Sequence, residues 1–320
     1  MPPISVRPPH PQSRFRGAFL GCLLGDAIGR PFEMMTTSDA RLGPSLERFL
    51  GRDEPLRYSD DSEMMIGVAE SLLRCGRVDA DDLLRTLAAN YDITRGYGHG
   101  MRLALEASRA GQTSVAFSVW PEGSKGNGGA VRVVPVACRY HEDVPRLVAM
   151  ANDATVITHA HMLGRAGGVA QALAIAYLLA QRSPRVDPAA LIAAVVAPAV
   201  VADTLVSEKL VLVADLLARG ASAAEAAAAL GNGALADEAF PLALFCFLRW
   251  APDFTEVVKN SVLAGGDTDT VAAMSGALAG AWAGEEALPK AWLARVEDGP
   301  RGRDHVLHLA DALFDAWRLD

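Results

Sequence analysis

Two short clusters of acidic and hydroxyl side chains each stand directly before a run of apolar residues with helical spacing. Residues 59–62 read Ser-Asp-Asp-Ser and precede apolar positions 64, 65, 68 and 72. Residues 265–270 read Gly-Gly-Asp-Thr-Asp-Thr and precede apolar positions 271, 274, 278 and 282. Apolar residues that recur every three to four positions form one face of an α-helix. Each cluster is therefore predicted to lie at a helix N-terminus, where free N–H groups and the helix dipole favour negative charge.

Two interpretations of these clusters are open. Asp and Thr are preferred N-cap residues, so each cluster can serve only to cap its helix. One acid satisfies a cap, however, and Asp267 and Asp269 would repel each other unless a cation lay between them. Carboxylate and hydroxyl oxygens are hard ligands that suit Mg²⁺, Mn²⁺ or Ca²⁺, and the sequence has no Cys/His cluster that would select zinc. Two such helix ends that face each other would hold one or two divalent cations.

The composition favours an all-α fold. Hydrophobic residues make up 51% of the 320 residues but aromatic residues only 6%, and the apolar content is largely Ala, Leu and Val. Such chains pack closely spaced helices rather than sheets. The formal net charge is −8 and no basic block occurs, which argues against nucleic acid or an anionic membrane as the main partner.

Cysteine usage and hydropathy predict the compartment. The four cysteines (Cys22, Cys75, Cys138 and Cys246) are far apart and form no CxxC pair, so a reducing compartment is expected. The longest apolar run, residues 188–202, is too short to span a bilayer. We therefore expect a soluble, cytoplasmic monomer without a membrane-spanning segment.

One domain is predicted for most of the chain. Residues 1–13 contain five prolines and are expected to form a flexible N-terminal arm. The first helix is expected at about residues 15–28, where small residues such as Gly17 and Gly21 line one face and allow a second helix to approach closely. No strand, internal repeat or linker is evident, so residues 14–320 are predicted to form a single domain.

Several residues have both a structural and a functional interpretation. Glu33 directly follows the first helix and Asp26 lies inside it, and the sequence alone leaves both roles open. His99, between two glycines, is expected to be a turn residue. His305 and His308, three residues apart on a late helix, are expected at the surface because nothing acidic accompanies them.

Residues 112–129 form the longest stretch without helical periodicity and end in a glycine cluster, Gly-Ser-Lys-Gly-Asn-Gly-Gly, at 123–129. Long loops inside a domain tend to be functional, and the amides of this one could hold a phosphate at the start of a helix. The spacing is not that of a P-loop, and a flexible connector is the alternative interpretation.

Four segments, in this order along the chain, resemble the ADP-ribosylglycohydrolase family. They are residues 21–33 (GCLLGDAIGRPFE), 59–62 (SDDS), 126–132 (GNGGAVR) and 265–270 (GGDTDT). The resemblance implies a single compact domain of orthogonally packed helices with a central cleft that binds two divalent cations, Mg²⁺ or Mn²⁺. It also implies hydrolysis at C1 of the distal ribose, which releases ADP-ribose from a modified protein side chain. The expected partner is an ADP-ribosylated protein or a small molecule that contains ADP-ribose.

The family's functional residues transfer to matching positions of this chain. The implied metal ligands are Ser59, Asp60, Asp61, Asp267, Asp269 and Thr270. The implied catalytic residues are Glu33, Asp60, Asp61 and Asp269, with Asp269 as the bridge between the cations and Glu33 as the proton-transfer group. The implied ADP-ribose contacts are Gly123, Ser124, Gly126, Asn127, Gly128 and His159.

Some features leave alternatives. Ser59 stands where the family usually has Thr, and Ser124 and Lys125 stand where some members have an acidic residue, so the acceptor linkage and any loop-borne base are open. The aromatic residues Phe32, Tyr97 and Trp120 either line an adenine pocket or pack in the core. A non-catalytic ADP-ribose-binding protein and a hydrolase of a related ADP-ribose ester or nucleotide are the alternative functions.

Overall fold

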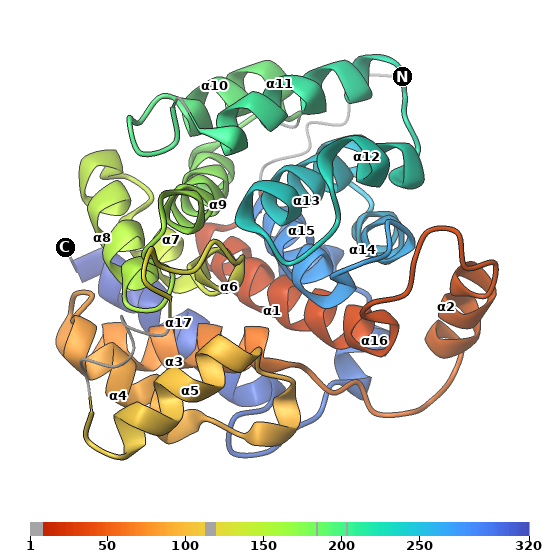
Figure 1. Ribbon diagram of the computed structural model, residues 1–320. Coiled ribbons are helices and arrows are strands. Elements are labelled where there is room, and N and C mark those ends of the chain that lie inside the picture. The colour runs from red at the N-terminus through yellow and green to blue at the C-terminus, as the bar shows by residue number, and fades with distance from the viewer. Residues whose placement is uncertain (1–8, 113–119, 184, 203, 320) are drawn as a thin grey trace.

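Helices α1 (Pro11–Gly29) and α15 (Thr268–Ala283), from opposite ends of the chain, run antiparallel with their backbones in contact. They form the centre of the computed structural model, which describes residues 9–112, 120–183, 185–202 and 204–319 (Figure 1). Glycines 17, 21, 25 and 29 of α1 face residues 280, 276, 272 and 268 of α15. A Cβ added at position 25 would lie 1.9 Å from the carbonyl oxygen of Ala272, so only glycine fits there. This contact places the end of α1 beside the first turn of α15.

The remaining elements are also helical. Their bounds are α2 (Leu42–Leu50), α3 (Asp60–Cys75), α4 (Ala80–Asn90), α5 (His99–Arg109), α6 (Gly128–Val131), α7 (Val134–Tyr140), α8 (Val144–Val156), α9 (Met162–Ala180), α10 (Pro188–Val196), α11 (Leu205–Ala218), α12 (Ala223–Leu230), α13 (Ala236–Trp250), α14 (Phe254–Leu263), α16 (Lys290–Arg295) and α17 (Arg303–Leu319). The described ranges contain two isolated bridges, Leu56 with Val296 and Gly126 with Leu235, but no strand. The predicted all-α fold is confirmed.

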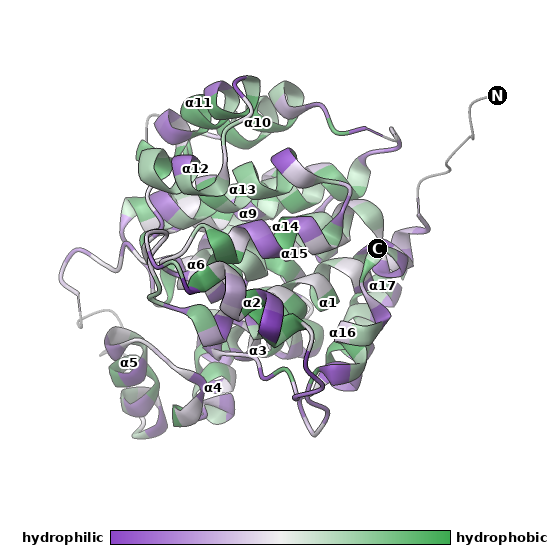
Figure 2. Cartoon of the chain, turned by 90° about the vertical axis from the view of Figure 1, so that its right-hand side faces the viewer, coloured by the Kyte–Doolittle hydropathy of each residue, from purple (hydrophilic) through white to green (hydrophobic). Residues whose placement is uncertain are grey.

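Helices α9, α13 and α14 pack around the α1–α15 pair, and α3 contacts its other side. Helices α10 and α11 cover one end of the molecule and α4 and α5 the other (Figure 1). Apolar residues concentrate on the inner helices, and polar residues lie mainly on outer faces and loops (Figure 2). Helix α9 is long and apolar enough to cross a membrane by length and composition, but most of it is buried among the other helices.

Two sequence predictions need correction. Helix α1 begins at Pro11, with the His10 side chain accepting a hydrogen bond from the Gln12 N–H, so residues 11–13 are helical rather than part of a loose arm. Proline at the first helical position costs nothing because its missing N–H would be unpaired there. His305 does have an acidic partner, because its Nε2 lies 2.9 Å from Oε1 of Glu70 on α3. Residues 1–8 of the predicted arm lie outside the described ranges.

Candidate active site

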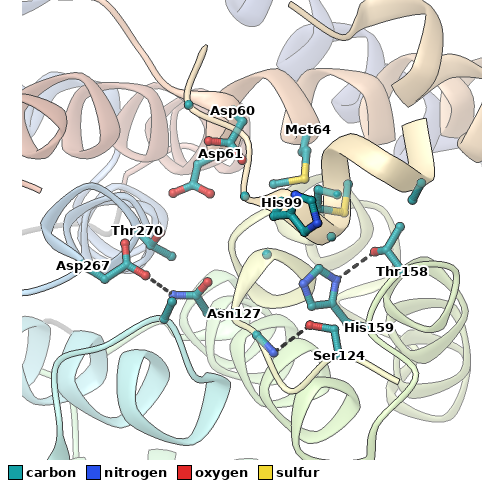
Figure 3. A pocket seen from close by; sticks show the side chains of 18 of the residues that line it. Asp60, Asp61, Met64, His99, Ser124, Asn127, Thr158, His159, Asp267 and Thr270 are labelled. Atoms are coloured by element: carbon teal, nitrogen blue, oxygen red, sulfur yellow. Dashed lines mark hydrogen bonds between the residues drawn. The ribbon is translucent and has the colours of Figure 1, made fainter. Parts of the chain in front are cut away.

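A cleft of about 360 Å³ opens between the N-termini of α3, α5 and α15 and the loop that precedes α6 (Figure 3). It gathers most of the residues predicted to form the site. Those that line it are Glu33, Asp60, Asp61, Ser124, Gly126, Asn127, Gly128, His159, Asp267, Asp269 and Thr270. Two predicted residues do not line it: Ser59 is the buried N-cap of α3, and Gly123 packs against the backbone of Ala160 and His161.

Five carboxylates converge on one wall of this cleft. Glu33, Asp267 and Asp269 each offer a carboxylate oxygen, and these oxygens lie within 4.8 Å of one another. Asp60 and Asp61 come from the first turn of α3 and line the same space. Oδ2 of Asp61 is buried without a hydrogen-bond partner. Clustered hard oxygens with an unpaired buried member are the donor set that a divalent cation such as Mg²⁺ or Mn²⁺ fits.

The electrostatics of this wall favour the binding of a cation. Burial and the carboxylates of Asp26, Glu33 and Asp267 raise the pKa of Asp60 to about 8. Burial and nearby carboxylates also raise the pKa values of Asp61 and Asp269 well above the usual range for aspartate. Without a cation, protons must relieve the repulsion among these acids. A bound divalent cation would allow all of them to ionise.

The backbone that precedes α15 fixes Glu33 beside Asp267. The N–H of Met34 donates to the carbonyl of Gly266, and the N–H of Gly266 donates to the carbonyl of Met35, both at 2.7 Å. Gly266 has a φ of +76°, and a Cβ there would lie 2.0 Å from the carbonyl oxygen of Asn232. Glycine is therefore required for both its conformation and its size. Met34 also has a positive φ, +66°, so the segment after Glu33 is held in a conformation that side chains rarely adopt.

Asp26 is a residue whose role the sequence left open. It lies fully buried inside α1 and accepts hydrogen bonds from the N–H groups of Ser59 and Ser62 at 2.8 and 2.9 Å. The Ser62 hydroxyl donates to the same carboxylate at 2.5 Å. Asp26 thereby attaches the N-terminus of α3 to α1. The sequence signal was a single acidic residue in the second half of α1, where the surrounding residues 17–29 are otherwise apolar or small.

The opposite wall is the glycine-rich loop. The Ser124 hydroxyl accepts a hydrogen bond from the Gly126 N–H at 3.1 Å and shapes the turn. The Asn127 side-chain amide donates to Oδ2 of Asp267 at 2.7 Å and so joins the loop to the acidic wall (Figure 3). Helix α6 begins directly after Asn127, and its first residue, Gly128, lines the cleft.

Of the three aromatic residues that could line an adenine pocket, two lie in the core and one lines the cleft. Phe32 and Tyr97 are buried, with Phe32 against Phe49 and the Tyr97 hydroxyl donating to Glu63, so both pack in the core. Trp120 is 50% exposed and lines the cleft. It packs so closely on α5 that a Cβ at Gly100 would meet its indole nitrogen at 2.5 Å.

His99 is also a cleft residue. It is the first residue of α5 and lines the cleft, whereas the sequence predicted only a turn residue. A single histidine between two glycines gives no sequence signal for a place in the cleft, because that place depends on how α5 packs on the rest of the chain.

The fold and the site define a class: an all-α protein whose acid-lined cleft lies between helix N-termini from distant parts of the chain. The family model for ADP-ribosylglycohydrolase matches residues 7–320. The chain therefore belongs to the ADP-ribosylglycohydrolase family.

Individual relatives agree with this membership. The ADP-ribosylhydrolase ARH3 of Xenopus tropicalis is 32% identical, over 89% of this chain and 91% of the relative. The ADP-ribosyl-(dinitrogen reductase) glycohydrolase of Rhodospirillum rubrum is 26% identical, over 90% of this chain and 92% of that protein. A solved structure of an ADP-ribosylglycohydrolase-related protein complex superposes with a TM-score of 0.74 and 26% identity, over 96% of this chain and 98% of the matched chain.

Proposed function

We propose that this protein is a divalent-cation-dependent hydrolase that releases ADP-ribose from modified protein side chains. The observation that carries the proposal is the convergence of five carboxylates in one cleft, with the buried Oδ2 of Asp61 left unpaired. Membership of the ADP-ribosylglycohydrolase family supports it. A purely structural group of caps would not need this many acids, because one acid per helix end satisfies a cap.

The residues proposed to hold two cations, Mg²⁺ or Mn²⁺, come from the two helix N-termini. They are Ser59, Asp60, Asp61, Asp267, Asp269 and Thr270. Of these six, Ser59 is the one that does not line the cleft, and its hydroxyl accepts a hydrogen bond from the Asp61 N–H at 3.2 Å. When bound, the cations would orient the ribose hydroxyls and a water molecule near C1.

In the proposed hydrolysis, a water oxygen forms a bond to C1 of the distal ribose while the bond from C1 to the acceptor side chain breaks. The developing oxocarbenium charge lies next to the acidic wall, which stabilises it. Glu33 is proposed to transfer the proton that the water loses or the leaving atom gains. Burial and the neighbouring carboxylate of Asp267 raise the pKa of Glu33, which suits a group that both holds and releases a proton.

The opposite wall is proposed to bind the ADP part of the ligand. Ser124, Gly126, Asn127 and Gly128 line this side of the cleft, and the three small residues among them leave room for a diphosphate close to the backbone. Trp120, exposed at the mouth, is proposed to stack on the adenine ring, which needs a large planar surface at the cleft edge.

The test is turnover against synthetic peptides that carry ADP-ribose on Arg or on Ser, with Mg²⁺, with Mn²⁺ and with EDTA. We expect free ADP-ribose, identified by mass spectrometry, from at least one linkage and only with a divalent cation. An exposed acid at the start of α4, Asp81, provides the matched control variant Asp81→Asn, which should keep full turnover.

Other outcomes of this assay would indicate one of the two alternative functions. AMP and a peptide that keeps ribose phosphate on its side chain would indicate cleavage of the pyrophosphate bond. ADP-ribose binding without turnover of any linkage would indicate a non-catalytic binding protein.

A further inference from the structure

Arg132 is a fully buried guanidinium whose partners are all uncharged in the described part of the chain. Its Nη2 donates to the carbonyl oxygens of Ala154 and Thr155, at 2.7 and 3.4 Å, at the C-terminus of α8. The negative end of the α8 dipole offsets part of the cost of burying the charge. Capping the C-terminus of a helix does not require a buried arginine, because an exposed Lys or Arg can bond the last carbonyl groups at a much lower desolvation cost. A further role is therefore expected.

The same Nη2 also donates to the hydroxyl oxygen of Thr158 at 2.7 Å. That hydroxyl oxygen lies 2.8 Å from Nδ1 of His159. The three side chains thus form a row, Arg132 to Thr158 to His159, that leads from the protein interior to the cleft.

The row determines which nitrogen of His159 carries the proton. Arginine can only donate hydrogen bonds, so the Thr158 oxygen is the acceptor of the first bond. The Thr158 hydroxyl proton is then available for Nδ1 of His159, which must accept it and leave its own proton on Nε2. If Nδ1 of His159 carried the proton instead, the Thr158 oxygen would have to accept hydrogen bonds from both the Arg132 guanidinium and the His159 ring. That arrangement would also leave the Thr158 hydroxyl proton without an acceptor among the described residues. Bonds aligned in one direction strengthen one another, so the first arrangement is favoured.

The other ring nitrogen of His159 faces the ligand side. Figure 3 shows Nδ1 joined to Thr158 and the opposite ring nitrogen turned away from it, toward the space inside the cleft. Nε2 lies over the glycine loop, since a Cβ added at Gly126 or Gly128 would be 3.3 or 3.2 Å from it. Side chains at these two positions would crowd the ring, so the loop leaves this nitrogen open. Burial and the charge of Arg132 lower the pKa of His159 to about 3, so the ring is neutral at physiological pH.

We propose that Arg132 and Thr158 are positioning residues that hold neutral His159 as its Nε2–H tautomer, a fixed hydrogen-bond donor to an oxygen atom of the bound ligand. Under the proposed function, on which the identity of the ligand rests, that acceptor is a phosphate or ribose oxygen of ADP-ribose. The tautomer itself does not depend on the proposed function. A neutral donor suits this position because an imidazolium would be attracted to the carboxylates across the cleft and would compete with the cations.

The first experiment measures the tautomer directly. Side-chain ¹⁵N NMR of the whole protein, without ligand, distinguishes a protonated from an unprotonated ring nitrogen, and His159→Gln identifies the signal of His159 among the seven histidines. We expect Nε2–H in the wild type and in Thr158→Ser, which keeps the hydroxyl. Thr158→Val has nearly the same shape but no hydroxyl, and we expect a mixture of tautomers. A purely structural role of Thr158 would leave the tautomer unchanged in all three proteins.

The second experiment measures ADP-ribose affinity by calorimetry in the presence of Mg²⁺. Thr158→Val is expected to weaken binding about ten-fold, the value of one well-placed hydrogen bond, and Thr158→Ser less than about two-fold. Nδ1–H or an imidazolium in the wild type would overturn the proposal. An unchanged tautomer or unchanged ADP-ribose affinity in Thr158→Val would also overturn it. Nε2–H in the wild type together with no ADP-ribose binding at all would instead refute the proposed function and leave the tautomer assignment intact.

Discussion

Asp26 in α1 binds Ser62 in α3 through both the backbone N–H, at 2.9 Å, and the hydroxyl, at 2.5 Å. Ser62 is in the first turn of α3, where an N-cap side chain normally accepts the hydrogen bond. Here a carboxylate from another helix accepts it. The hydroxyl of the N-cap residue, Ser59, accepts a hydrogen bond from the Asp61 N–H at 3.2 Å and also interacts with the Asp26 carboxylate, so Asp26 contacts both serines that flank Asp60 and Asp61.

Asp26→Asn is expected to destabilise this junction. The amide cannot accept hydrogen bonds at both of its side-chain positions, so at least one buried donor from Ser59 or Ser62 loses its partner. The expected cost is about 1–3 kcal/mol in the free energy of unfolding. Thermal unfolding in EDTA measures it, and cation titration by calorimetry should show weaker binding because Asp60 and Asp61 lose their fixed position. Wild-type cation affinity in this variant would show that the junction does not position the ligands.

Asp269→Asn is expected to raise the stability of the metal-free protein while it abolishes hydrolysis. The substitution removes a buried carboxyl group that must either take up a proton or repel its neighbours, but it keeps the side-chain oxygen that accepts from the Thr270 N–H at 3.0 Å. In EDTA we expect Tm to rise by about 2 °C or more, the equivalent of about 1 kcal/mol. Saturating Mn²⁺ should raise Tm in the wild type and much less in the variant. Turnover close to the wild-type value would exclude Asp269 as the bridging ligand.

The metal-free protein is expected to lose stability as the pH rises from about 7.5 to about 8.5. In this window the folded protein retains protons on the acidic wall, since the pKa of Asp60 is about 8 and those of Asp61 and Asp269 are well above the ordinary 3.8. The unfolded chain has already lost these protons. The folded state therefore binds more protons than the unfolded state, and stability falls with rising pH.

Histidine does not obscure this pH effect. The pKa values of buried His141 and His159 are lowered in the folded protein, that of His159 to about 3, and in the unfolded chain a histidine is mostly neutral above about pH 7.5, so neither residue changes charge on unfolding in this window. Denaturant unfolding in EDTA at several pH values measures the effect. Saturating Mg²⁺ should stabilise the protein more at the upper end of the window than at the lower end, because protons compete with the cation. A pH-independent stability in EDTA would contradict the mutual repulsion of the acids.

Glu33→Gln is expected to reduce kcat far more than ADP-ribose affinity. The amide keeps the shape of the side chain but cannot exchange a proton with water or with the leaving atom. Steady-state turnover and calorimetric binding of ADP-ribose separate the two effects. Weaker binding with a preserved kcat would reassign Glu33 to ligand binding.

Gly25→Ala is expected to prevent the close approach of α1 and α15. The added Cβ would lie 1.9 Å from a backbone oxygen of α15, which cannot move without displacing the whole helix. Gly43→Ala in α2 is the matched control, because the nearest atom to its Cβ is 3.8 Å away. We expect Gly25→Ala to lose several kcal/mol of stability and its cation binding, and Gly43→Ala to be neutral or slightly stabilising. Equal thermal stability of the two variants would contradict the tight contact.

The sequence contained the local chemistry of the site. Asp267 and Asp269 could be assigned to a helix N-terminus because capping and apolar periodicity depend on neighbours a few residues apart. The small residues on one face of the first helix likewise indicated a close helix contact. The ordered motifs then indicated the family, which the family comparison confirmed. The metal ligands and the catalytic residues taken from those motifs stay predictions.

The sequence alone thus determined that the chain forms α-helices, that the first helix has one face of small residues, and that two helices begin with clustered acids. Only the tertiary structure decided which of these ends meet. Residue 29 of α1 contacts residue 268 of α15, Asp26 binds Ser62, Arg132 reaches Thr158, and His305 finds Glu70 on another helix. Such pairings depend on how whole helices pack against one another, because the free energy of a buried contact is set by the shape and polarity of both surfaces at once. A single segment of sequence contains only one of those two surfaces.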